Sequence, residues 1–203
     1  MANWSYLCAT NRKAIYPSYG DHPYDPRRQT IASETYCVPL LWLGLFRPAD
    51  LVQRSFSQEG ATFVAEAPLC ARSKAIRQFR AALPHLEDMF HECGPLDGFA
   101  ELFLKALEPL RFRYLTIELE EIECMAKSRE WFRDTLRAAL AGIETDYSTQ
   151  ARERFVYLAQ LFKLRRFPPP RLFLDKMKGS DEDYVLHGRI LGSCDQGRAV
   201  PWY

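Results

Sequence analysis

The chain has 203 residues, of which 27 are Lys or Arg and 26 are Asp or Glu, and 47% are hydrophobic. With the histidines neutral its net charge is +1, so no overall field attracts nucleic acid or an anionic membrane. The aromatic content of 13% argues against a disordered chain. This length predicts one globular domain, residues 1–203, that buries roughly 70% of its unfolded surface.

The N-terminal segment and the cysteines predict a cytoplasmic protein. The segment Met1–Leu7 has no basic stretch before an apolar one, so a secretory signal is not expected. The longest uncharged apolar run, Thr35–Phe46, is shorter than the roughly 20 residues of a membrane-spanning helix. The six cysteines form no CxxC pair, and we expect them to be free thiols.

The first third of the chain predicts two strands and one short buried helix. Asn3–Thr10 alternates between two faces, as a strand does, and prolines and glycines predict a loop over Asn11–Arg28. Pro39 suits a first helical turn, and the apolar run to Phe46 leaves that helix no polar face. Ala61–Ala67 is the second predicted strand.

The middle of the chain changes to helical spacing. Ile76, Phe79 and Leu83 repeat at intervals of three and four, and we expect Pro84 to kink or divide this helix. Asp97 is the predicted N-cap of the next helix. The apolar stripe of that helix consists of Phe99, Leu102, Phe103, Ala106, Leu107 and Leu110.

The last ninety residues predict strands at both ends and helices between them. Arg113–Leu119 alternates, with Leu115, Ile117 and Leu119 expected inward and Tyr114, Thr116 and Glu118 outward. Ser128 is expected to cap a helix that ends near Gly142, and another helix is expected from about Ser148 to Arg166. Arg171–Leu174 and Tyr184–Leu191 have the alternation of late strands. Because strict alternation of strand and helix is missing, we expect a single α+β domain with a mainly antiparallel or mixed sheet packed against several amphipathic helices.

Four glutamates form the densest acidic cluster: Glu118, Glu120, Glu121 and Glu123. Glu118 and Glu120 would share one face of a strand, an arrangement that suits acid–base carboxylates or a divalent metal. No His or Asp motif accompanies them, and the ordinary alternative is a solvated strand edge that runs into a helix start. We therefore expect no catalytic group, metal or cofactor, and interpret the cluster as an acidic surface at a strand edge.

Two further groups of residues have a binding interpretation. Lys163, Arg165, Arg166, Arg171, Lys176 and Lys178 are interleaved with phenylalanines, a mixture that can bind phosphates and stack bases. Prolines interrupt this stretch, and cations at a helix C-terminus also have a purely structural use. In the first loop, Tyr16, Tyr19 and Tyr24 are typical of a binding surface if they are exposed and of a core if they are buried.

The opening Met1-Ala2-Asn3-Trp4-Ser5-Tyr6-Leu7, followed by Ser33-Glu34 and the Pro39 helix, resembles a family of uncharacterised bacterial proteins that begin Met-Ala-Asn-x-Ser-Tyr-Leu. The match is specific over these first residues and looser to about Phe56. The chain departs from the family pattern at Trp4, where a basic residue is expected, and at Cys8, where an aromatic one is expected. The resemblance implies a small bacterial cytoplasmic protein of the accessory-gene type, and it transfers no catalytic residues. Immunity partners of secreted antibacterial toxins recur among such proteins.

The leading hypothesis is an immunity-type protein that neutralises a cognate protein toxin by occluding its active site, without binding nucleic acid or membrane. Many toxins have basic clefts, so we expect the acidic row Glu118–Glu123 to form part of the contact surface, or otherwise the aromatic first loop. One alternative is a small enzyme with a carboxylate site at Glu118 and Glu120, joined by a residue such as His187. Another is a nucleic-acid binder that uses Arg165, Arg166 and Arg171. The oligomeric state is not indicated.

Overall fold

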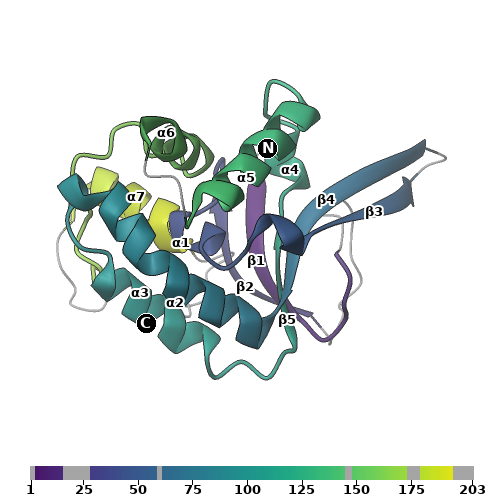
Figure 1. Cartoon of the computed structure of the whole chain (residues 1–203), viewed down its shortest axis with the longest axis horizontal. Helices are drawn as coiled ribbons and strands as arrows, with labels where there is room; N and C mark the ends of the chain where they lie inside the picture. Colours follow the sequence, from purple (N-terminus) through teal and green to yellow (C-terminus); the bar gives the residue numbers. More distant parts are fainter. Residues whose placement is uncertain (1–2, 16–27, 59–60, 145–147, 173–178, 194–203) are drawn as a thin grey trace.

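The structure is a computed structural model that describes residues 3–15, 28–58, 61–144, 148–172 and 179–193. Within these ranges a five-stranded antiparallel sheet packs against seven α-helices, which confirms the predicted α+β class. Most helices gather at one end of the molecule, whereas strands β3 and β4 extend away from it at the other (Figure 1). None of the described helices is both long and apolar enough to cross a membrane.

The sheet has the strand order β2-β1-β5-β4-β3, so β5 is its central strand. Every described pair of neighbouring strands is antiparallel, and β5 pairs with β1 on one side and β4 on the other. The strand bounds are Trp4–Thr10 for β1, Arg28–Thr35 for β2, Leu51–Gln58 for β3, Ala61–Ala71 for β4 and Tyr114–Glu118 for β5. The predicted strands at Asn3–Thr10, Ala61–Ala67 and Arg113–Leu119 are confirmed.

The short helix α1 lies at the centre of the core, as its lack of a polar face predicts. Its four residues are fully buried, and the Trp42 indole donates a 2.8 Å hydrogen bond to the Leu191 carbonyl oxygen. The helix bounds are Leu40–Leu43 for α1, Arg72–Met89 for α2, Asp97–Leu107 for α3, Glu120–Glu123 for α4, Arg129–Gly142 for α5, Thr149–Leu158 for α6 and Asp181–Leu191 for α7. Short 3₁₀ turns occupy Pro48–Asp50 and His91–Cys93.

Several predicted elements need correction. The strands β2 and β3 were not predicted, because their many polar residues weaken the apolar alternation. Helix α2 is continuous through Pro84, so this proline does not divide it. Leu96, and not Asp97, is the N-cap of α3, while Asp97 opens its first turn, where a carboxylate complements the helix dipole.

The predicted late strand at Tyr184–Leu191 is wrong, because this segment belongs to helix α7. A capping box begins the helix: the Ser180 hydroxyl accepts from the Asp183 N–H at 3.1 Å, and the Asp183 carboxylate accepts from the Ser180 N–H at 3.1 Å. The other predicted late strand, Arg171–Leu174, does not form at Arg171 and Leu172, which lie in a turn. Positions 173 and 174 are outside the described residues.

Helix α6 ends at Leu158, eight residues before the predicted end, because a Schellman motif closes it. The Gln160 N–H donates to the Tyr157 carbonyl at 3.2 Å, and the Leu161 N–H donates to the Val156 carbonyl at 2.8 Å. The motif needs a left-handed residue after the cap, and Gln160 has a φ of 54° there. Glycine usually occupies this position, so the sequence carried no visible stop signal before the later prolines.

We expect Gln160→Gly to raise the free energy of unfolding by about 1 kcal/mol, because glycine adopts a positive φ without the Cβ clash. Urea denaturation monitored by circular dichroism measures this change. Gln160→Asn should lie between the two, since asparagine tolerates the left-handed region better than glutamine. A Gly variant less stable than the parent chain would contradict this. It would mean that the hydrogen bond from the Gln160 side-chain amide to the Tyr157 carbonyl, 2.9 Å long, contributes more than the backbone strain costs.

Candidate functional site

The predicted acidic strand edge lies in the interior of the molecule. Glu118 ends the central strand β5, and Glu120–Glu123 forms helix α4. The exposed fractions of Glu118, Glu120 and Glu123 are 2%, 5% and 3%. Glu121 is partly buried, and its Oε2 accepts a 2.9 Å hydrogen bond from the Trp4 backbone N–H. The prediction of a solvated row of carboxylates is therefore wrong, and the contact surface proposed there loses its structural premise.

Arginines from other parts of the chain explain how these carboxylates are buried. Arg28 of β2 forms an ion pair with Glu118, and Arg133 of α5 forms one with Glu123. A carboxylate buried without such a partner would be strongly destabilising. Because Arg28 lies 90 positions before Glu118, the local sequence around the glutamates does not reveal the pairing.

The Arg28–Glu118 ion pair adjoins a buried thiol. The Arg28 guanidinium lies 3.5 Å from Cys8 Sγ, and the Thr30 hydroxyl lies 3.9 Å from the same sulfur. Burial raises the pKa of Glu118 to about 7, against the lowering effect of Arg28. Burial also raises the pKa of Cys8 far above its ordinary value, so the thiol stays protonated and is a poor nucleophile. This cluster ties strands together and does not have the properties of a reactive site.

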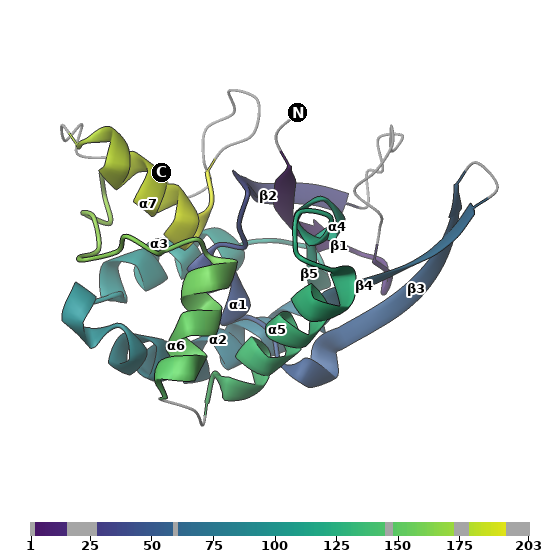
Figure 2. The same cartoon turned by 90° about the horizontal axis from the view of Figure 1, so that it is seen from above.

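The donor set of the enzyme alternative is not assembled in the described structure. His187 lies on α7, away from α4 in both views (Figures 1 and 2). Its Nε2 is 3.1 Å from the Pro170 carbonyl oxygen, and its ring packs on Phe99 with centroids 5.6 Å apart. Among the described residues, no group of three or more His, Cys, Asp and Glu side chains is placed to hold a metal ion. The five described cysteines are free thiols, as predicted.

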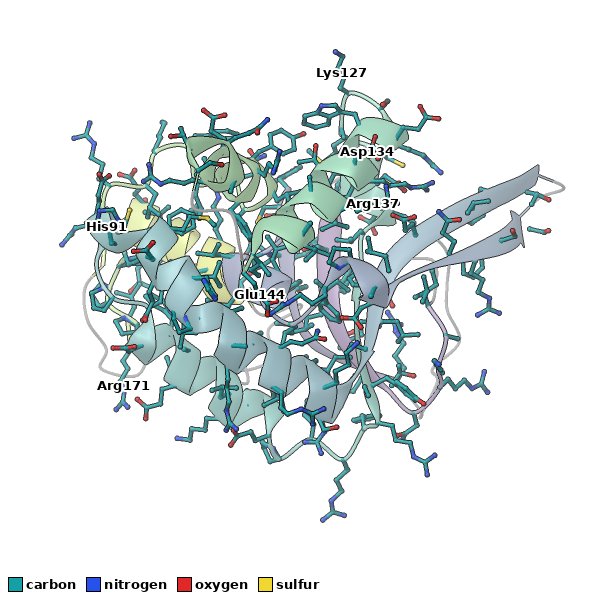
Figure 3. All side chains as sticks on the ribbon, viewed as in Figure 1. His91, Lys127, Asp134, Arg137, Glu144 and Arg171 are labelled. Atoms are coloured by element: carbon teal, nitrogen blue, oxygen red, sulfur yellow. The ribbon has the colours of Figure 1, made fainter. Side chains whose placement is uncertain are left out.

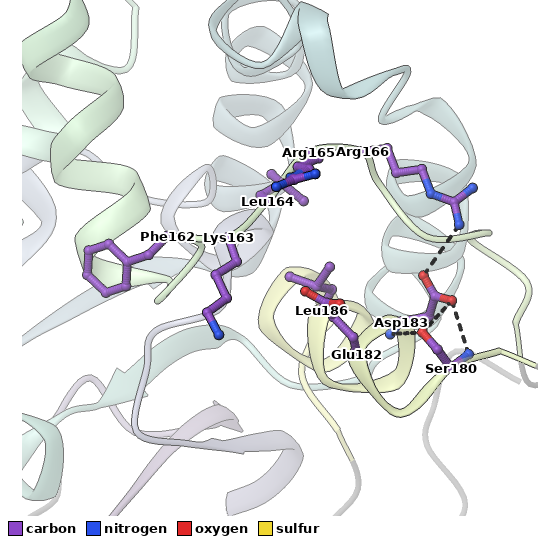
Figure 4. A pocket seen from close by; sticks show the side chains of 9 residues that line it. All are labelled: Phe162, Lys163, Leu164, Arg165, Arg166, Ser180, Glu182, Asp183 and Leu186. Carbon is purple, nitrogen blue, oxygen red and sulfur yellow. Dashed lines mark hydrogen bonds and ion pairs between the residues drawn. The ribbon is translucent and has the colours of Figure 1, made fainter.

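Lys176 and Lys178 of the basic stretch lie outside the described residues, and its described members do not form a continuous positive strip. The Arg171 guanidinium is 3.4 Å from a Glu101 carboxylate oxygen, and that of Arg166 is 4.0 Å from Asp183. Arg165 and Arg166 line an open hollow of about 610 Å³ whose other wall carries Glu182 and Asp183 (Figure 4). The basic side chains of Lys127 and Arg137 lie near helices α4 and α5, far from Arg171 in the view of Figure 3. This mixture of charges does not resemble a phosphate-binding track.

A continuous group of exposed apolar side chains lies elsewhere, and we call it the aromatic surface. Six large hydrophobic side chains in the described part of the chain are exposed, and five of them belong to this group. The sixth, Val64, lies on β4 and is not part of it. The aromatic surface consists of Tyr36, Met125, Trp131, Tyr157, Phe162 and Val185, which follow β2 or lie on and around helices α4 to α7.

Ring contacts hold the centre of the aromatic surface in place. The rings of Trp131 and Tyr157 meet edge to face, with centroids 4.7 Å apart and an interplanar angle of 87°. Tyr157 in turn meets Phe162 at a centroid distance of 6.4 Å. Figure 2 shows the helices concerned, with α6 between α5 and α7. Such edge-to-face pairs are favourable beyond their buried area, so these rings are held in defined positions.

A small hollow of about 140 Å³ opens within the aromatic surface. Its lining residues are Tyr36, Ile122, Met125, Ala126, Phe132, Tyr157, Leu158 and Gln160. Two of them, Tyr36 and Gln160, have positive φ values of 61° and 54°, and among the described non-glycine residues they alone do. Residues other than glycine are costly in this region of φ, and such strain concentrates at functional sites. The exposed apolar side chains, the hollow between them and the two strained residues therefore indicate this surface as the candidate binding site.

The described residues of the predicted site do not belong to the aromatic surface. The glutamates of the acidic cluster are interior, and Tyr16, Tyr19 and Tyr24 lie outside the described residues. The aromatic surface was not predicted, because its members come from separate parts of the sequence and only the fold brings them together. Comparisons with protein-family models, curated proteins and solved structures find no match for this chain.

The raised pKa of Glu118 predicts how stability depends on pH. Between pH 4.5 and about 7 the folded chain keeps a proton on Glu118 that the unfolded chain has released. Stability contributed by this group therefore falls as pH rises through that window, by roughly 3 kcal/mol in total.

We expect the free energy of unfolding of the parent chain, minus that of Glu118→Gln, to fall by this amount between pH 4.5 and 7.5, as measured by urea denaturation. The variant removes the titration but keeps the shape of the side chain. Subtracting its curve also removes the effects of the other titrating groups. A difference that does not change with pH would contradict the buried, proton-retaining state of Glu118.

Proposed function

We propose that this chain is an immunity-type binding protein of the bacterial cytoplasm, which neutralises a cognate protein toxin by occluding its active site and docks through the aromatic surface. The resemblance of the first seven residues to the bacterial family supports the biological setting. The aromatic surface is the observation that carries the binding role. Soluble proteins rarely leave a contiguous patch of large apolar side chains exposed unless a partner covers it.

The composition of the surface matches that of protein–protein interfaces. Tryptophan, tyrosine, phenylalanine and methionine are enriched at interface centres, where single side chains can dominate the binding energy. Trp131 and Phe162 expose 39% and 62% of their side chains, so a partner can bury substantial area on each. Charged residues such as Lys163, Glu182 and Arg189 lie around Phe162 and Val185, as the polar rim of an interface does.

The surface is also preorganised for binding. The Trp131–Tyr157 contact holds both rings, so little side-chain freedom remains to be lost in the complex. The hollow between Tyr36 and Tyr157 offers room for one apolar side chain of the partner. We infer that such a side chain anchors the complex while the rest of the domain covers the catalytic cleft of the toxin.

The surface is tested by Trp131→Ala against the matched control Val64→Ala. Both side chains are similarly exposed, at 39% and 40%, but only Trp131 belongs to the aromatic surface. We expect Trp131→Ala to weaken toxin binding by roughly 30-fold or more, because truncating a central aromatic anchor costs about 2 kcal/mol. Val64→Ala should leave the Kd within two-fold. Isothermal titration calorimetry measures both, and equal effects of the two substitutions would move the interface away from this surface.

The function itself is tested by looking for a toxin-domain protein encoded beside the gene for this chain, which the proposal requires, and by co-expressing the two. We expect co-expression of the chain to restore growth of cells that produce the toxin, and the two proteins to co-purify. Trp131→Ala should reduce protection while its circular dichroism spectrum stays that of the parent chain. Failure of the parent chain to protect or to bind would refute the immunity role, whatever surface is concerned.

A further inference from the structure

Strands β3 and β4 form a two-stranded arm beyond the sheet. Strand β4 has eleven residues, but it pairs with β5 only through Leu69–Ala71. Strand β3 pairs with β4 along its whole length, from Leu51 opposite Pro68 to Gln58 opposite Ala61. Figures 1 and 2 show the arm extending away from helices α2, α3 and α7, with none of the drawn helices or strands beyond the outer side of β3.

The register tells which backbone groups of β3 face outward. Antiparallel pairs alternate between hydrogen-bonded and non-hydrogen-bonded, and Pro68 has no N–H to offer its opposite residue, Leu51. Leu51–Pro68 and every second pair after it are therefore non-hydrogen-bonded, namely Gln53–Glu66, Ser55–Val64 and Ser57–Thr62. Val64 belongs to this class, and its carbonyl accepts from Arg133 of α5 at 2.8 Å, outside the arm.

It follows that Gln53, Ser55 and Ser57 direct their N–H and C=O groups away from β4. No hydrogen bond links these backbone groups to another described residue. The opposite edge of the sheet differs, because Ser33 of β2 exchanges two hydrogen bonds with Ser193, at 3.1 and 2.8 Å. The outer side of β3 is thus the open edge of the described sheet.

This edge also lacks the usual protection against pairing. Natural edge strands are commonly short or carry lysine, proline or a bulge. Strand β3 is eight residues long, its register is unbroken, and it contains neither lysine nor proline. Its single charged residue, Arg54, is exposed, but its guanidinium is already engaged: it donates to the Ile15 carbonyl at 3.2 Å and lies over the Phe56 ring. A strand of this kind is a template for another strand.

We propose that β3 pairs with β3 of a second copy of this chain, antiparallel about a two-fold axis at Ser55. An outward-facing residue on the axis forms a hydrogen-bonded pair with its own copy. In this register Gln53 lies opposite the partner's Ser57, and Ser57 opposite the partner's Gln53. All six outward N–H and C=O groups of Gln53, Ser55 and Ser57 are then bonded, and the two sheets become one.

Side chains favour this register with a second copy. It places Arg54 opposite the partner's Phe56 and never opposite the partner's Arg54, so no like charges meet across the axis. Arg54 already lies over the ring of its own Phe56, 5.1 Å from the centroid, so each guanidinium would lie between two rings. The side chains of Ser55, on the axis, and of Ser57 are uncharged and small. The aromatic surface lies on other elements and remains free in the pair.

The oligomeric state is tested by sedimentation equilibrium of the full chain with Ser55→Pro and Ser55→Ala. The Ser55 N–H makes no bond to β4, so proline there removes two hydrogen bonds of the pair while the arm keeps its own. We expect a dimer for the parent chain and for Ser55→Ala, and a dissociation constant raised roughly 30-fold for Ser55→Pro. A monomeric parent chain would overturn the proposal. So would a dimer that Ser55→Pro, with its circular dichroism spectrum unchanged, does not weaken.

The register is tested by disulfide cross-linking under mild oxidation, which does not depend on the proline variant folding. Ser55→Cys places two thiols on the axis, with Cα atoms about 5.5 Å apart, within the range of a disulfide. Ser57→Cys is the matched control, because its opposite residue is the partner's Gln53 and its own copy lies about 14 Å away. Cross-linking of Ser55→Cys alone supports the register. Cross-linking of neither variant, or of both equally, would overturn it. Trp131→Ala should leave the cross-linking of Ser55→Cys unchanged, because Trp131 is not on the arm.

Discussion

The structure depends on one constraint, which is that the short strand β5 lies between β1 and β4. Thr116 is paired on both sides, and Glu118, which pairs only with Tyr6 of β1, is buried as well, along with Leu115 and Ile117. Arg28 reaches across β1 from β2, past the Cys8 thiol, to meet Glu118, and above the raised pKa of this group its positive charge compensates the buried carboxylate. Three strands are thereby held by one ion pair, in addition to their backbone hydrogen bonds.

The shortness of β5 also determines what the rest of the sheet can do. With five residues β5 pairs only with the last part of β4, Leu69–Ala71, and the rest of β4 is contacted by other elements on that side. Arg133 and Arg137 of α5 make these contacts, with the Val64 carbonyl and the Glu66 carboxylate. The arm is therefore fastened to the body along β4, whereas the far side of β3 stays open. A central strand as long as β4, which has eleven residues, would have paired along the whole of β4 and left no separate arm.

Local pattern predicted the elements whose stabilising contacts are local. The fully apolar helix α1 and the Ser128 cap of α5 were found in this way. The same reasoning misjudged Glu118, because alternation within a strand does not tell what covers its second face, and the partner of Glu118, Arg28, is distant in the sequence. It also mistook Tyr184–Leu191 for a strand, although the capping box of Ser180 and Asp183 was a readable helix signal. The candidate site was beyond such reasoning, since distant segments supply its side chains.

Backbone strain and the aromatic surface have a common physical origin. Tyr36 and Gln160 are held in the left-handed region at a cost of about 1 kcal/mol or more each. Hydrogen bonds keep them there: the Tyr36 N–H donates to the Asn3 carbonyl, and the Val38 N–H donates to the Leu158 carbonyl, at 2.9 and 2.8 Å. The second bond joins the segment after β2 to the end of α6, so the two strained turns face each other across one hollow. Glycine would relieve the strain at both turns, whereas the residues present, Tyr36 and Gln160, line the hollow of the candidate binding surface.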